Sequence, residues 1–291
     1  VSLAVFAAAS ILMVITSCTG KSGDASVIKT IKVGDYQEDS FDWKSMLGQD
    51  LHLVELADTS KEYSFTEISK LVFKKDKFYI SDWLTRRIIV FDLNGNPEFV
   101  LNRRGRGPGE YLQVTDFDVD NDGDLWILDG QKNAVTHYSS EGKSLSQRST
   151  GDCQYSHIAY SDGNLLLSVA YWDKTENSEY KAVAADTNLN VTSRYGRIPE
   201  FRDPDFMFPS VGFSKIGDVL MYNNPFDDYV SVFENDEYKG DYYFDFGSKK
   251  VPDDARKSVE PHLESIADYM FLLNAVGVYK DYVVGTMTEG G

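Results

Sequence analysis

The sequence predicts an all-β protein of the β-propeller class, built from four-stranded blades of about 47 residues. The first observation is a repeat of short apolar strands and polar turns that begins near Ile68. Its third strands recur at intervals of 47, 47 and 48 residues, at Phe91, Tyr138, Ala185 and Phe233. The second observation is a set of closing glycines with intervals of 46, 45 and 51 residues, at Gly105, Gly151, Gly196 and Gly247. A period of about 40 to 50 residues with four strands is typical of propeller blades.

Composition narrows the classes of partner. The chain has 291 residues, enough for one large domain, a formal charge of −17 and a pI near 4.6. Nucleic-acid binding needs a basic face, so this charge argues against it. Acidity also disfavours adhesion to anionic lipid by charge alone. Aromatic residues make up 13% of the chain, which suits packed strands and excludes disorder.

The N-terminus predicts an exported, lipid-anchored protein. Residues Val1–Ser17 are small and apolar, too short to cross a bilayer comfortably, and are typical of a signal-peptide core. The run ends in Ile15-Thr16-Ser17-Cys18, which resembles the lipobox of bacterial lipoproteins. That resemblance implies cleavage before Cys18, its acylation, and a location at the outer membrane or cell surface. The alternatives are a membrane anchor or an ordinary secretory signal with a chance cysteine. We expect residues 18–26 to be a tether and residues 27–291 the propeller domain.

The repeat places four blades along the chain, at about residues 65–102, 115–149, 156–195 and 210–246. Propellers commonly close by pairing an N-terminal strand with the last blade, and Leu51–Leu56 is the predicted closing strand. Residues 252–268 break the pattern and predict a helical insertion, kinked or divided at Pro261. A fifth blade is expected from near Tyr269, with strands at residues 271–274 and 282–285. The chain stops at Gly291 within that blade, so we expect further C-terminal residues in the complete protein.

An acidic run, Asp118 to Asp124, resembles a calcium-binding EF-hand loop. In register with the other repeats it is a hairpin turn, for which Asp, Asn and Gly are the favoured residues. A strand, Leu125–Leu128, is predicted where an EF-hand would have a helix. We therefore interpret the run as a turn, and keep as an alternative a site for calcium or another divalent metal at Asp118, Asp120 and Asp122.

The string Gly105-Arg106-Gly107-Pro108-Gly109-Glu110-Tyr111 is the most distinctive in the chain. It does not fit a P-loop or a dinucleotide fingerprint, because the spacing and the surrounding elements differ. A degenerate copy, Gly196 to Phe201, occupies the same place after a fourth strand. Recurrence there favours a linker between blades, shaped by glycine and proline. Two interpretations stay open: a linker alone, or a linker that also presents Arg106 to a ligand.

These features together resemble the six-bladed β-propeller lipoproteins of Bacteroidetes, which are distant relatives of NHL-repeat propellers. The resemblance depends on the lipobox, on Leu-Val-Glu-Leu-Ala-Asp-Thr at 53–59, on Phe-Tyr-Ile-Ser-Asp at 78–82 and, most specifically, on the string at 105–111. It covers the whole chain. It implies six blades and a place in the cell envelope, and it implies little about activity.

The signals for catalysis are few. Four histidines are present, and none has a metal-ligand spacing of the His-x-x-x-His kind: His52, His137, His157 and His262. No Gly-x-Ser-x-Gly elbow occurs, and Cys153 lacks a His-rich setting. The sequence therefore favours a non-enzymatic binding protein. The alternative is a hydrolase or lyase with a metal in the central channel, whose ligands would come from the inner strands of several blades.

Strand parity predicts two faces. Turns after first and third strands gather acidic residues on one face, and loops after second and fourth strands gather arginine and aromatic residues on the other. Such residues are enriched at recognition surfaces. The expected ligand is a peptide, a glycan or an anionic small molecule, and other envelope proteins are candidate partners. The predicted ligand-binding residues are Trp83, Arg86, Arg87, Arg106, Tyr111, Trp172, Arg197 and Phe201.

Overall fold

The computed structural model describes residues 3–7, 27–33, 52–57, 60–198, 203, 206, 211–224, 226–234, 237–279 and 282–288. The chain divides into two compact units. The first unit comprises Asp42–Ser178 and Val183–Ser193, and the second comprises Val1–Phe41, Glu179–Ala182 and Arg194–Gly291. No helix in the described part is long and apolar enough to cross a membrane.

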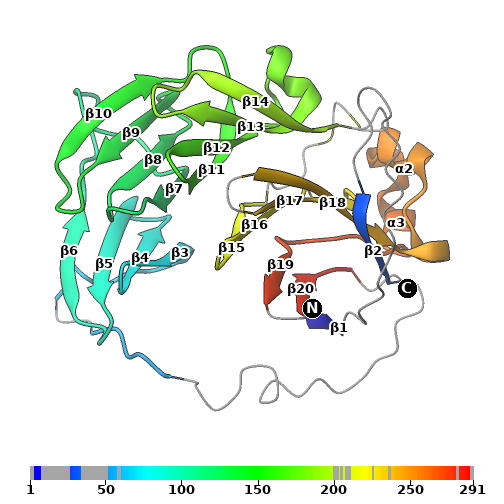
Figure 1. Ribbon diagram of the computed structural model, residues 1–291, viewed down its shortest axis with the longest axis horizontal. Coiled ribbons are helices and arrows are strands. Elements are labelled where there is room, and N and C mark those ends of the chain that lie inside the picture. The colour runs from blue at the N-terminus through cyan, green and yellow to red at the C-terminus, as the bar shows by residue number, and fades with distance from the viewer. Residues whose placement is uncertain are drawn as a thin grey trace. The chain divides into compact units, whose positions relative to one another are not determined.

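The first unit contains blades one and two and most of blade three. Each blade is an antiparallel sheet of four strands in sequence order (Figure 1). Blade one consists of β3 (Ile68–Lys74), β4 (Lys77–Asp82), β5 (Arg87–Asp92) and β6 (Pro97–Leu101). Blade two consists of β7 (Asp116–Val119), β8 (Leu125–Asp129), β9 (Ala134–Tyr138) and β10 (Ser144–Ser149). Blade three consists of β11 (Tyr155–Ser161), β12 (Asn164–Val169), β13 (Tyr180–Asp186) and β14 (Val191–Arg197).

The central strands of these blades are buried on both faces. All five residues of β8 are buried, as are the last five of β12. Their side chains pack against the next blade: a cluster around Tyr79, Phe117 and Tyr138 joins blade one to blade two. A second cluster around Trp126 and Ile158 joins blade two to blade three. The fourth strand of blade two, at one edge of its sheet, is polar and largely exposed. Burial on both faces explains the short continuous apolar runs of these strands, such as Leu125–Leu128 in β8 and Leu165–Leu167 in β12.

A five-residue turn recurs four times in the first unit, at 92–96, 120–124, 139–143 and 186–190. In each, the first residue donates its backbone N–H to the carbonyl of the fifth, and the fourth donates to the carbonyl of the first. The fourth position has positive φ, between 67° and 89°, at Gly95, Gly123, Gly142 and Leu189. Glycine adopts this conformation without strain, so it occupies three of the four positions.

The second unit contains blade four and the elements that follow it. Blade four is β15 (Ser214–Ile216), β16 (Val219–Tyr222), β17 (Tyr229–Glu234) and β18 (Glu237–Asp245). A fifth strand, β2 (Val27–Lys32), pairs parallel with β18. A further sheet has the order β1 (Leu3–Ala7), β20 (Tyr282–Thr286) and β19 (Gly277–Tyr279). The signal-peptide prediction for residues 1–17 is not tested by this pairing, and Cys18 lies outside the described residues.

The predicted helical insertion is confirmed. It contains α2 (Asp253–Lys257), the 3-10 turn η3 (Glu260–His262) and α3 (Leu263–Ile266), divided around Pro261 as expected. Short 3-10 turns also occur at η1 (Glu176–Glu179) and η2 (Gly247–Lys249). The insertion packs on blade four through Phe226, Val251 and Ala255. Within it Arg256 is buried and forms a two-point ion pair with Asp228, at 2.6 and 3.1 Å.

Four blades between residues 65 and 246 are confirmed, and two details differ from expectation. Residues 52–57 form no strand; Ala57 donates its N–H to the carbonyl of Gly95, beside blade one. The strand added to blade four is β2 instead. After the insertion, Leu272 makes only an isolated bridge to Met287, and the regular strand is β19. For β2 the partner that decides strand pairing, β18, lies far away in sequence, whereas β19 pairs with the adjacent strand β20.

Candidate functional site

Loops that follow second and fourth strands meet at one end of the first unit, as parity predicted. Arg86, in the loop between β4 and β5, donates from Nη1 to the carbonyl of Leu112 at 3.2 Å. Lys132, between β8 and β9, donates from Nζ to the carbonyls of Gly107 and Glu110 at 2.9 and 2.8 Å. Gln154 donates its N–H to Asp173, in the loop after β12. These bonds join the loops into one face, which we call the loop face.

The string 105–111 is a linker on the loop face. Glu110 accepts the N–H of Gly107 through Oε2 at 2.7 Å, and an added Cβ at Gly105 would lie 1.9 Å from the same oxygen. Gly109 has φ of +68° and leaves no room for a Cβ beside Ser144. Tyr111 is fully buried and donates its hydroxyl to the carbonyl of Leu101 at 3.0 Å. Gly109 is therefore required by its positive φ and by the close approach of Ser144, and the string is the linker between β6 and β7 that both interpretations assume.

The predicted ligand-binding residues divide into two groups. Trp83 and Trp172 are 50% and 53% exposed, and the side chain of Arg197 is 59% exposed with a 3.4 Å ion pair to Glu179. Arg106 is exposed as well, together with Arg103 and Arg104 on the same linker. Exposed residues are available to a ligand, so their role stays a prediction. Arg197 belongs to the second unit, and Phe201 lies outside the described residues.

The remaining three have structural contacts that account for them. Arg87 donates to the carbonyls of Glu62 and Ser64 and to Thr85, at 2.9 to 3.0 Å, and so fastens the segment before β3. Arg86 binds Leu112 as described and has φ of +56°. Tyr111 is buried in the core between blades one and two, which corrects its assignment to a ligand surface. Burial also raises the pKa of its phenol to about 12.

Inner strands of the first three blades are joined by a polar cluster that the sequence did not reveal. Asp116 on β7 accepts from Lys70 on β3 at 2.9 Å and from the N–H of Ile158 on β11 at 2.9 Å, and it lies 3.3 Å from Nδ1 of His157. Burial opposes ionisation of Asp116, but Lys70 and His157 outweigh it and hold the pKa of this carboxyl at about 2. Both oxygens are engaged, so the cluster links blades to one another. In the same way Asp118 accepts the N–H of Tyr160 at 2.7 Å.

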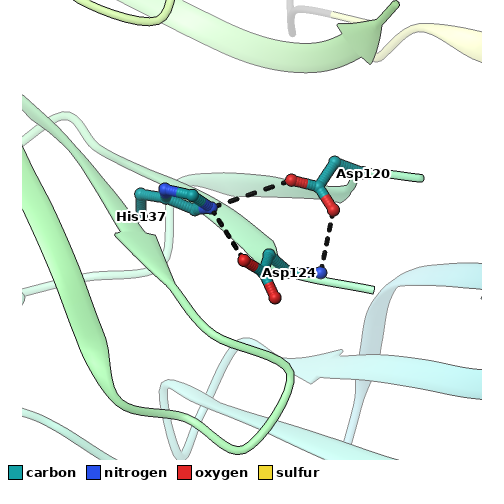
Figure 2. Close-up of side chains that lie close together, drawn as sticks. All are labelled: Asp120, Asp124 and His137. Atoms are coloured by element: carbon teal, nitrogen blue, oxygen red, sulfur yellow. Dashed lines mark hydrogen bonds and ion pairs between the residues drawn. The ribbon is translucent and has the colours of Figure 1, made fainter. Parts of the chain in front are cut away.

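A second polar cluster lies at the opposite end, where the turns after first and third strands meet. It consists of Asp120, Asp124 and His137, which point toward one another in Figure 2. One acceptor or donor atom from each lies within 4.8 Å of the other two, so the three side chains could hold a metal ion. Of the residues named as an alternative metal set, only Asp120 belongs to this cluster. Sequence analysis placed the two aspartates in a turn but did not connect His137 with them.

The architecture and its contacts define a β-propeller, in which buried polar and apolar clusters join blades one to three. The chain belongs to the family DUF5128, described as a 6-bladed β-propeller, whose model matches residues 21–270. No protein of curated function is significantly similar.

Solved structures add the fold alone. A Bacteroides fragilis protein described as exported is 19% identical, with a TM-score of 0.66, and the match covers 86% of this chain and 71% of that one. A member of the DUF4221 family from Bacteroides vulgatus is 12% identical, with a TM-score of 0.50, and the match covers 76% and 70%.

Proposed function

We propose that this protein is a non-enzymatic binding propeller of the cell envelope, which recognises a peptide, a glycan or an anionic small molecule on its loop face. The observation that carries the proposal is the pair of half-exposed indoles, Trp83 and Trp172, on loops that follow second strands. Tryptophan is large and apolar, so leaving half of it in water is unfavourable unless a partner covers it. The exposed Arg106 belongs to the same set of loops.

The chemistry of these side chains limits the class of ligand. Indole faces pack on sugar rings and apolar side chains, and guanidinium groups bind carboxylate or sulfate in a two-point geometry. A cationic set is notable on a chain with a net charge of −17, because it does not follow from composition. The inner strands add no support for the hydrolase or lyase alternative, since Asp116 and Asp118 bind neighbouring blades with their carboxylates.

Binding can be tested with a panel of uronic-acid and sulfated oligosaccharides and acidic peptides. For a probe that binds, the double variant Trp83→Ala/Arg106→Ala should weaken affinity by about 1–3 kcal/mol, the scale of lost charged hydrogen bonds. The matched control is Leu93→Ala/Lys143→Ala, which removes one exposed apolar and one exposed cationic side chain from the opposite end. Equal affinity in the two double variants, with both folded, would rule out the loop face as the binding surface.

The envelope location is supported by Ile15-Thr16-Ser17-Cys18 and by the exported Bacteroides fragilis protein of similar fold. We expect cleavage before Cys18 and acylation of its thiol, so that the membrane is contacted only through the lipid. A fatty-acid analogue fed to expressing cells should label the wild type and not Cys18→Ala. Equal labelling of the two would contradict this anchor.

A further inference from the structure

The turn at 120–124 directs two carboxylate oxygens at one imidazole nitrogen. Nε2 of His137 lies 3.3 Å from Oδ2 of Asp124 and 3.7 Å from Oδ2 of Asp120. The Nε2 atom is buried and has no hydrogen-bond partner in the part of the chain that the structure describes. A buried ring nitrogen without a hydrogen bond is costly, so its orientation toward two oxygens requires an explanation.

Each of the three side chains is held in place by other contacts. Oδ1 of Asp120 accepts the N–H groups of Asp122 and Asp124, both at 2.9 Å, and Oδ1 of Asp124 accepts the N–H of Ser140 at 2.9 Å. The His137 ring stacks on Trp126, with centroids 3.9 Å apart and planes at 10°. Trp126 also donates from Nε1 to Oδ2 of Asp120 at 3.0 Å. The second oxygen of each aspartate and the imidazole nitrogen are therefore fixed in their directions before anything binds.

Two kinds of arrangement would satisfy this geometry: an Nε2–H of His137 that donates to the carboxylates, or a cation between the three side chains. A charge-assisted N–H···O bond is typically about 2.7–2.9 Å long, shorter than either distance here. A tetrahedral zinc site with bonds of about 2.0–2.2 Å places neighbouring ligand atoms roughly 3.3–3.6 Å apart. The observed 3.3 and 3.7 Å are close to that range.

We infer that Asp120, Asp124 and His137 form a binding site for a divalent transition-metal ion of the Zn²⁺ type. Imidazole with carboxylate suits zinc and its neighbours, whereas calcium takes six to eight oxygen ligands. Three protein ligands leave one tetrahedral position for water, and Asp124 and His137 are each partly accessible, at 20% and 19% of the side chain. The Trp126 N–H acts as the outer hydrogen bond that orients a ligand oxygen, as metal sites commonly require. The ion would join the end of β7, the start of β8 and the end of β9.

The decisive experiment titrates Zn²⁺ into the tag-free protein by calorimetry and compares two variants of the same turn. Asp124→Asn and Asp122→Asn each remove one negative charge, but only Asp124 has an oxygen at the site; Asp122 is exposed. We expect Asp124→Asn and His137→Gln to weaken Zn²⁺ binding at least about a hundredfold, beyond the effect of an outer-contact change. Asp122→Asn should stay close to the wild type. At about a hundredfold excess over Kd, Zn²⁺ should raise Tm by on the order of 5 °C.

Thermal unfolding without metal shows whether each variant folds, and anomalous scattering at the zinc edge shows where the ion sits in crystals of the wild type. A peak between Asp120, Asp124 and His137 supports the site. The inference is overturned by absence of Zn²⁺ binding, by equal losses in Asp122→Asn and Asp124→Asn, or by a peak elsewhere. Calcium binding that needs Asp118 and Asp122 but not His137 would overturn it too, in favour of the loop-type site.

Discussion

Four aspartates of blade two each accept a hydrogen bond from outside their own turn: Asp116, Asp118, Asp120 and Asp124. The aspartates in the third-strand turns of blades one and three bind within their own turn. Asp92 accepts the N–H groups of Asn94 and Asn96 and the side-chain amide of Asn96. Asp186 has the same set of contacts with Asn188 and Asn190. Asp120 accepts the same two backbone N–H groups, but the fifth residue of its turn is Asp124, whose side chain has no amide to donate.

One residue at the fifth position therefore changes what the turn can do. Asparagine there closes the turn on itself and engages the second carboxylate oxygen. With Asp124 at the fifth position, Oδ2 of Asp120 instead accepts from Trp126 and faces His137, and Asp124 adds a second carboxylate beside it. The same backbone hydrogen bonds thus support a solvated turn in blades one and three and a candidate metal site in blade two.

The largest difference in stability between an aspartate that binds other segments and one that binds only its own turn is expected at Asp116. Asp116→Asn removes the negative charge beside Lys70 and His157 and replaces one acceptor oxygen by a donor, so we expect a loss of about 2–4 kcal/mol in the free energy of unfolding. Lys70 keeps some contact with water, at 23% of its side chain, which places the loss toward the lower end. Asp92→Asn, in an exposed turn, should move the urea midpoint far less. Equal shifts in the two variants would remove the distinction.

Acid sharpens the same prediction. In the folded protein the pKa of Asp116 is about 2, below the ordinary value of about 4, so folding favours the ionised carboxylate. Ionised Asp116 therefore adds about 2–3 kcal/mol to the free energy of unfolding. This contribution is present above pH ~4 and is lost as the pH falls toward ~2. Stability of Asp116→Asn should depend less on pH in this window than stability of the wild type. The measurement is urea unfolding between about pH 5 and pH 2, a window that contains both pKa values, ~4 and ~2. Parallel curves of unfolding free energy against pH for the two proteins would contradict the assignment.

The sequence was sufficient for the blades because their signals are local. Apolar runs of β-branched and aromatic residues between Asp, Asn and Gly turns recur at a fixed interval, and each turn needs the same backbone conformation. Strand order within a blade then follows from hairpin connection. The N-terminal strand was misplaced because Leu51–Leu56 and Val27–Lys32 have similar patterns, and only the edge of β18 decides between them.

Candidate sites were harder to predict because they depend on register across strands. His137 lies opposite Trp126 in the β8–β9 pairing. This register brings it close to Asp124, which lies 13 residues earlier, 137 − 124, in the turn before β8. Metal-ligand spacings of the His-x-x-x-His kind describe one helix face and do not describe neighbours across a sheet. Arg87 was assigned to a ligand because its contacts, the carbonyls of Glu62 and Ser64, belong to a segment without a regular pattern.

The smallest predicted effect tests how the turns of blades one and three close. The side-chain amide of Asn96 is the main cause of the lowered pKa of Asp92, with its backbone N–H next. Asn96→Ala keeps the backbone donors and removes the amide, so the pKa of Asp92 should rise toward, but not reach, its ordinary value. Asn190→Ala should do the same for Asp186, whose pKa is lowered first by the Asn190 side chain. Carboxyl NMR titration measures both, and an unchanged pKa in either variant would show that the fifth residue does not control that turn.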